Sequence, residues 1–298
     1  MFAPHGVVAA SHSLASQAGL AVLQRGGNSI DAAVTAAAVM NLAEPMMTGI
    51  GGDMFAIAWI ESERRLVGLN ASGRAGSLFS LEALRAAGHS EMPRTGAATV
   101  TVPGALSGWA ALMGVAYRGF RLWELPPNGQ GIAALEMLRI LEPYDLGAMG
   151  RNSADYLHHL VEAKKLTFAD LEAFVGDPDV MTVKVERLLD DAFIAGRRSH
   201  LDPLHAHGRV EPGSALGDSE ATYLAAADAD GNMISFINSL AGLFGSGIVV
   251  PGTGFALQNR GAGFTMSEGR ANTAASGRRP FHTIIPGFIT CMGPDGSG

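Results

Sequence analysis

Residues 221–239 read ATYLAAADADGNMISFINS. Two short apolar runs, Tyr223 to Ala227 and Met233 to Ser239, flank a turn of Asp, Gly and Asn residues at 228–232. Apolar runs of this length on either side of such a turn predict a β-hairpin. The sequence therefore places an antiparallel pair of strands after residue 220.

The residues before this hairpin alternate between strand and helix patterns. Asn28 is a good N-cap for an Ala-rich helix that stops at Glu44-Pro45, because proline disfavours helix in the residue before it. The expected strands are Gly6 to Ala10, Met54 to Ile60, Leu66 to Leu69 and Phe120 to Leu125. The other expected helices are Ser13 to Gln24, Leu81 to Ala87, Gly104 to Gly114, Gly131 to Leu141 and most of 152–200, followed by a linker at 202–217.

Composition indicates a globular α/β protein. The chain has 298 residues, of which 47% are hydrophobic and only 7% aromatic. This content is ample for a sizeable core, and the excess of Ala and Gly favours close packing of helices and sheets. We expect a single domain over residues 1–298.

Charge and cysteine content exclude several classes of partner. The net charge is −7 and no run of Lys or Arg occurs, which argues against nucleic acid and anionic membranes. The single cysteine, Cys291, excludes an internal disulfide and a cysteine-rich zinc site. Residues 1–5 show no signal-peptide pattern and predict a cytoplasmic protein. A homo-oligomer is left open.

Three histidines near Asp202 invite a metal interpretation. His200, His205 and His207 lie in a segment rich in Pro and Gly, without the i, i+4 spacing of helical ligand pairs. A solvated loop is the expected alternative, and no metal site is predicted.

Four segments, taken in order, carry a family likeness. They are residues 26–33 (GGNSIDAA), 44–52 (EPMMTGIGG), 124–131 (ELPPNGQG) and 244–248 (FGSGI). Together they resemble the gamma-glutamyltransferase family of N-terminal-nucleophile hydrolases, which includes glutathione hydrolases. The form of residues 257–261 (LQNRG) is closer to the acylase-like branch of that family.

This resemblance implies a fold and a chemistry. Relatives are four-layer αββα sandwiches of the α+β kind, made as one chain that cuts itself into a large and a small subunit. Here 1–220 is similar to the large subunit and 221–298 to the small one. The exposed threonine of relatives attacks a γ-glutamyl or glutaryl-type amide, with its own amine as base and without metal or cofactor.

The nucleophile position carries no hydroxyl in this chain. Counting back from Asp228 to the first residue of the expected strand places Ala221 there. Thr222 is an alternative nucleophile, but a shift of one residue along a strand turns its side chain to the other face. Ser219, in the preceding loop, is a second alternative, and Ser239 completes the catalytic candidates.

The substrate-binding candidates also follow from the resemblance. Arg74 is the candidate clamp for a substrate carboxylate, since a guanidinium suits that group. His282 and Thr283 occupy the place of a hydroxyl pair that contacts the same carboxylate. No acid lies at 257–263 to bind a substrate amine. The remaining candidates are Gly51, Gly52, Asn259 and Arg260.

Two further departures from the family pattern are expected. A long helical segment is missing near residues 114–117, and the sequence ends before the glycine-pair loop that forms the oxyanion hole in relatives. The sequence therefore predicts an impaired amide hydrolase. The alternative is a pseudoenzyme that binds acidic amides or pairs with another subunit.

Overall fold

The computed structural model describes residues 3–103, 109–110, 113–208 and 222–292, and contains two antiparallel sheets. The larger sheet has the strand order β1-β7-β8-β2-β3-β4. Its strands are β1 (Gly6–Ala10), β7 (Thr222–Asp228), β8 (Met233–Ser239), β2 (Asp53–Ile60), β3 (Arg65–Ala71) and β4 (Trp109–Ala110). The smaller sheet, β5-β6-β9, consists of β5 (Met113–Tyr117), β6 (Phe120–Glu124) and β9 (Phe288–Cys291).

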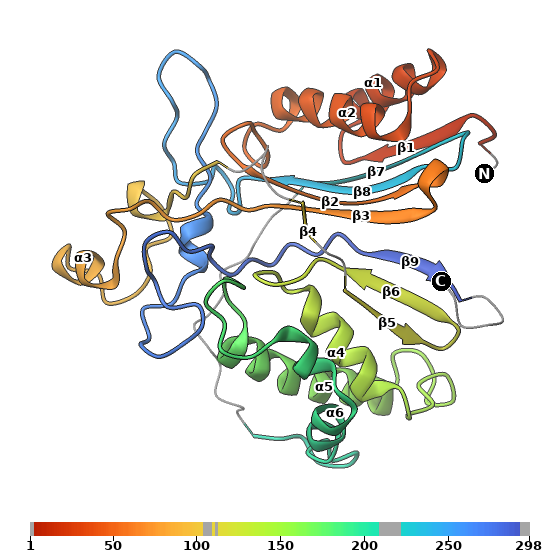
Figure 1. Ribbon diagram of the computed structural model, residues 1–298, viewed down its shortest axis with the longest axis vertical. Helices are drawn as coiled ribbons and strands as arrows, with labels where there is room; N and C mark the ends of the chain where they lie inside the picture. The colour runs from red at the N-terminus through yellow and green to blue at the C-terminus, as the bar shows by residue number, and fades with distance from the viewer. Residues whose placement is uncertain (1–2, 104–108, 111–112, 209–221, 293–298) are drawn as a thin grey trace.

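Helices cover the outer face of each sheet, so that the molecule has four layers (Figure 1). The helices α1 (Ser13–Gln24) and α2 (Ser29–Ala43) lie on the larger sheet. The helices α4 (Gly131–Leu141), α5 (Ala154–Phe174) and α6 (Asp191–Arg198) lie beyond the smaller one. The short helix α3 (Leu81–Ala86) stands apart. The predicted αββα sandwich of α+β type is confirmed.

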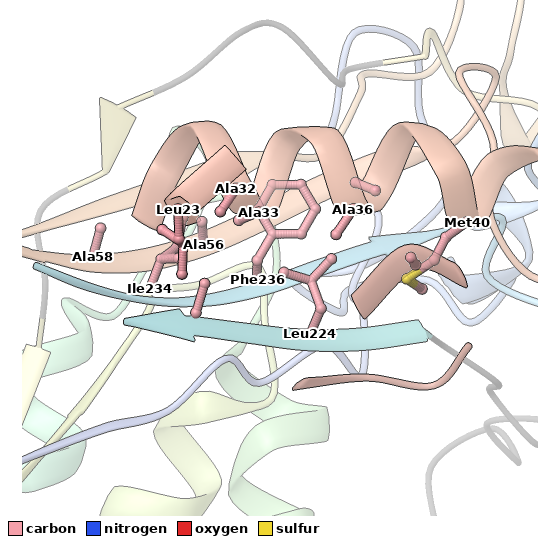
Figure 2. Packing of buried hydrophobic residues seen from close by; sticks show 13 residues of the cluster. Leu23, Ala32, Ala33, Ala36, Met40, Ala56, Ala58, Leu224, Ile234 and Phe236 are labelled. Atoms are coloured by element: carbon pink, nitrogen blue, oxygen red, sulfur yellow. The ribbon is translucent and has the colours of Figure 1, made fainter. Parts of the chain in front are cut away.

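The first apolar core lies between the larger sheet and the helices α1 and α2. The Ala-rich helix α2 supplies most of its helical side chains. The Asn28 side chain caps it by accepting hydrogen bonds from the backbone N–H groups of Ile30 and Asp31. Figure 2 shows small α2 side chains and Met40 facing Leu224 and Phe236 of the sheet. Small residues let the helix approach closely, and larger side chains from the strands fill the space between.

A second apolar cluster lies between the two sheets. It contains Phe55 and Ile57 of β2, Ile237 of β8, and Leu125 and Ile284 from the loops that follow β6 and precede β9. Alternate residues of β2 therefore serve different cores, because successive side chains in a strand point to opposite faces. Phe55 and Ile57 face the smaller sheet, whereas Ala56 and Ala58 face α2.

The predicted hairpin of residues 223–239 is confirmed as β7 and β8, which lie between β1 and β2 in the larger sheet. Thr222 pairs with Asn238 and Ala227 with Met233. At the turn, the Asp228 carboxylate accepts hydrogen bonds from the backbone N–H groups of Ser29, Asp230 and Asn232. The hairpin turn is thereby joined to the start of α2.

Most predicted elements are confirmed, but the helix expected over Gly104 to Gly114 is wrong where the structure describes it. Trp109–Ala110 pairs with β3, and Met113–Tyr117 pairs with β6. The tight turn to β6 is made by Arg118 and Gly119, with φ of 50° and 86°. Pairing of β4 with β3, and of β5 with β6 across this turn, overrides the local helical pattern.

Two other expectations concern loops and membranes. Residues 202–208 form the described part of the expected linker, and 209–217 lie outside the described residues. Among the helices in the described part of the chain, none is long and apolar enough to cross a membrane.

Candidate functional site

A buried ion pair lies where β2 begins. Asp53 pairs in register with Ser239 at the end of β8, and both residues are fully buried. The Asp53 carboxylate accepts a hydrogen bond from Nε of Arg260 at 2.9 Å, and one from the backbone N–H of Gly73 at 3.3 Å. Arg260 is only 3% exposed. Burying both charges is costly unless they are paired and hydrogen-bonded, as they are here.

The backbone of Arg260 is fixed by its neighbour Gln258, which is also buried. The Gln258 side-chain oxygen accepts a hydrogen bond from the backbone N–H of Arg260. Its amide nitrogen donates to the carbonyl oxygen of Thr101 at 3.0 Å. The backbone N–H of Gln258 donates to the carbonyl oxygen of Gly51 at 3.0 Å. Gln258 therefore connects the backbone of Arg260 to the glycine turn that precedes β2.

Asn128 joins three segments around this pair. Its side-chain oxygen accepts from Asn70 Nδ2 at 3.1 Å, and its nitrogen donates to the carbonyl oxygen of Pro280 at 2.6 Å and to Ser72 Oγ at 3.2 Å. Its backbone oxygen accepts from the N–H of His282 at 3.1 Å. The buried Asn128 thus positions the end of β3 and the loop that carries His282.

His282 packs on the ring of Phe55, with 4.5 Å between the ring centroids. Its Nδ1 accepts a hydrogen bond from the backbone N–H of Ile284 at 3.3 Å. Burial, and then the positive charge of Arg260, hold the pKa of the His282 imidazole well below its usual range. The ring is therefore neutral at pH 7, and its proton lies on Nε2.

Arg74 lies at the edge of the same region and is occupied by other partners. Its guanidinium contacts Asp177 at 2.6 Å, Asp179 at 2.5 Å and the carbonyl oxygen of Gly277 at 2.8 Å. The side chain is 37% exposed. These contacts join the segment after β3 to the loop that follows α5.

The other predicted binding residues shape the surrounding loops. Gly51 approaches Ala256 so closely that a Cβ there would lie 2.3 Å from its carbonyl oxygen. A Cβ on Gly52 would lie 2.5 Å from the carbonyl oxygen of Ser239. The Asn259 side chain accepts from the N–H of Gly242 and donates to the carbonyl oxygen of Arg94, both at 2.7 Å. Thr283, half-buried, follows His282.

Thr222 lies on the other face of the larger sheet. Its hydroxyl is 3.5 Å from a carboxylate oxygen of Glu44, just after α2. Its strand neighbour Asn238 hydrogen-bonds Thr48 on that helical side. Ala221 and Ser219 lie outside the described residues.

The structure therefore gathers Ser239, Arg260 and His282 near Asp53 and Asn128, two residues that sequence reasoning missed. Asp53 was detectable as an acid that follows a glycine turn and opens an apolar strand. Asn128 lies in the conspicuous segment 124–131. Nothing in the local sequence pairs either residue with its partner.

Two of the three histidines that suggested a metal contact different carboxylates. His205 contacts Asp202 at 3.2 Å, whereas His207 contacts Glu162 at 2.9 Å. Within the described residues, no group of three or more His, Cys, Asp and Glu side chains is arranged to hold a metal ion.

Comparison with known proteins places this arrangement in a family. The family model described as Gamma-glutamyltranspeptidase matches residues 15–114 and 112–297. The chain belongs to the gamma-glutamyltranspeptidase family. A crystal structure of cephalosporin acylase from Bacillus halodurans is similar with a TM-score of 0.87 and 31% identity, over 98% of this chain and 76% of that one.

Two curated relatives are also similar. The Glutathione hydrolase-like YwrD proenzyme of Bacillus subtilis (strain 168) is 28% identical over 407 residues, covering 96% of this chain and 76% of that protein. The Acylase ACY 1 proenzyme of Pseudomonas sp. (strain SE83) is 36% identical over 171 residues, covering 57% of this chain and 31% of that protein. The family resemblance of the four sequence segments is confirmed.

Proposed function

We propose that this chain has the scaffold of an amide hydrolase that acts on γ-glutamyl or glutaryl-type amides, but lacks the nucleophile. The observation that carries the proposal is the residue at position 221. The family resemblance implies a threonine at this distance before the Asp-x-Asp-Gly-Asn turn, and this chain has Ala221. A methyl group can neither attack an amide nor form the ester needed for self-cleavage.

Thr222 is a poor substitute nucleophile because its side chain lies on the face of the larger sheet that α1 and α2 cover. Leu224 and Ala226, which share its face, pack against α1 and α2. Arg260 and His282 instead contact Phe55, whose side chain lies between the two sheets. A hydroxyl on the helical side cannot reach an amide bound beside Phe55 without a change of strand register.

The names of the similar proteins support the reaction class. One is a cephalosporin acylase, one a glutathione hydrolase-like proenzyme and one an acylase proenzyme. We assign substrate binding to Arg74, Gly51, Gly52, Asn259, Arg260, His282 and Thr283, and a supporting catalytic role to Ser239. Ser239 accepts a hydrogen bond from the backbone N–H of Ala241 at 2.9 Å.

We further propose that an internal segment of the family is missing from this chain. The family model matches in two parts that meet at residues 112–114. The alignment with the Bacillus subtilis relative spans 407 residues, although this chain has 298. Both findings support a gap near 114–117, where β5 connects directly to β6 through a tight turn.

The second candidate function is a binding protein without turnover. It is favoured by the buried hydrogen bonds that join Arg260 to Asp53 and Asn128 to Pro280, which persist although the nucleophile position has no hydroxyl. Such a protein binds an acidic amide, or pairs with a subunit that supplies the missing parts, and leaves the amide uncut.

Restoring the hydroxyl tests the proposal. We expect Ala221→Thr to gain hydrolysis of a glutaryl or γ-glutamyl p-nitroanilide, on the order of 10³-fold above the parent chain, because the nucleophile carries most of the chemistry. The matched control is Thr222→Ala in the same background, which should retain that gain. Equal hydrolysis by the parent chain would refute the proposal, and a gain that Thr222→Ala abolishes would assign the nucleophile to residue 222.

A further inference from the structure

Residues 202–207, which we call the strap, lie against α5 with little apolar contact. Residues 203–206 are all exposed, and Leu204 is 83% exposed. Asp202 shapes the turn, because its Oδ1 accepts hydrogen bonds from the backbone N–H groups of Leu204 and His205. A segment that buries so little apolar surface is held mainly by its polar contacts, and such segments open locally at low cost in free energy.

A charged pair on α5 holds the last residue of the strap. Glu162 and Lys165 are three residues apart on this helix, and their charged groups are 2.6 Å apart. Oε2 of Glu162 accepts hydrogen bonds from the backbone N–H of His207 at 3.1 Å and from its Nδ1 at 2.9 Å. Nζ of Lys165 donates to the carbonyl oxygen of His207 at 3.0 Å. Two side chains therefore bind the backbone donor, the backbone acceptor and the ring of one residue.

The first residue of the strap lies where apolar packing ends. Leu201 is buried in a cluster with Ile194 of α6 and Leu166 of α5. In the next residue, the carbonyl oxygen of Asp202 accepts a hydrogen bond from Nε2 of His158 on α5 at 2.8 Å. Apolar packing therefore fixes the chain as far as Leu201, and polar contacts with α5 hold it beyond that point.

Glu162 is ionised although its side chain is only 2% exposed. Burial by itself raises the pKa of this carboxyl, but the hydrogen bonds from Lys165 and His207 outweigh burial and lower the pKa to about 2. A buried carboxylate that loses its partners is strongly destabilised. The contacts between Glu162 and His207 therefore stabilise the closed strap more than a surface ion pair would.

We propose that Glu162 and Lys165 form a latch that closes the strap on α5, and that the strap opens as a unit of its own while the two sheets stay folded. The closed strap fixes one end of the connection between the two subunit-like regions, and the other end is Thr222 at the start of β7. Opening adds the strap to that connection and lengthens its reach by roughly 20 Å. The latch thus sets how freely the two regions are connected, whether or not the proposed function holds.

Hydrogen exchange of the full chain at pH 7, measured by mass spectrometry, tests the latch. Glu162→Gln keeps the shape of the side chain but removes the charge that pairs with Lys165. We expect peptides that cover the strap to exchange at least about tenfold faster, since a hydrogen bond to a charged group contributes about that factor. Peptides from α2 and β2 should be unchanged. The matched control is Glu172→Gln on the same helix, which should leave the strap unaffected because Glu172 contacts Arg270 instead.

A double-mutant cycle protects the test against a misfolded variant. His207→Ala removes the imidazole and should also speed exchange of the strap. Because the ring and the Glu162 carboxylate act together, His207→Ala should have a smaller effect in Glu162→Gln than in Glu172→Gln. Unchanged exchange of the strap in Glu162→Gln would overturn the latch, and so would independent effects of the two substitutions. Equally faster exchange in α2 and β2 would overturn the opening of the strap as a separate unit.

Discussion

At the scale of single residues, Glu124 is a carboxylic acid in largely apolar surroundings. It is buried at the end of β6, and one of its carboxylate oxygens has no partner among the described residues. Burial raises its pKa to about 7. Gly131, at the start of α4, lies so close that a Cβ there would be 2.9 Å from Oε2 of Glu124. The folded protein therefore keeps a proton that the unfolded chain releases near pH 4.5.

The first prediction concerns the pH dependence of stability. The pKa of Glu124 is higher in the folded state than in the unfolded chain. Its contribution to the free energy of unfolding is therefore complete below pH 4.5 and falls as the pH rises to about 7. The loss is roughly 3 kcal/mol, at about 1.4 kcal/mol per pKa unit. Glu124→Gln should reduce the fall in the free energy of unfolding between pH 4.5 and 7 by roughly this amount in urea titrations. The exposed Glu91→Gln serves as control, and an unchanged slope in Glu124→Gln would contradict the account.

At the scale of elements, the segment after β3 depends on a close backbone contact. The backbone N–H of Val102 donates to the carbonyl oxygen of Arg74 at 3.0 Å. A Cβ on Gly73, between Ser72 and Arg74, would lie 1.5 Å from the carbonyl oxygen of Val102. Only glycine lets the two backbones lie this close while Gly73 also donates to Asp53.

We therefore expect Gly73→Ala to lower the free energy of unfolding by about 1–3 kcal/mol or more, because overpacking forces the backbone apart. Gly76→Ala is the matched control three residues away, since a Cβ there meets nothing within 4 Å. Chemical denaturation of both variants measures the difference. Equal stability of the two would show that the 72–74 segment does not pass Val102 as described.

Elements defined by local signals were predictable from the sequence. The Asn28 cap and the proline after Glu44 delimit α2, and the Asp- and Gly-rich turn sets the 222–239 hairpin. The strands at 109–110 and 113–117 were not, because each depends on a partner strand rather than on its own pattern. The buried pair Asp53–Arg260 could not be predicted for a similar reason, because the two residues are 207 positions apart in the sequence.

At the scale of the whole molecule, the two subunit-like regions share one sheet. From the second region, β7 pairs with β1 of the first, and β8 pairs with β2. The second region also contributes β9 to the smaller sheet, beside β6. Two polypeptides produced by a cut before Thr222 would therefore stay together under native conditions, and only a denaturing measurement separates them.

The intact mass of the purified protein under denaturing conditions tests the missing nucleophile most directly. Without a hydroxyl at position 221 no ester forms, and we predict one polypeptide near 30.9 kDa after prolonged incubation. Two polypeptides whose masses add up to that value, with a new amino terminus at or near residue 221, would contradict the account.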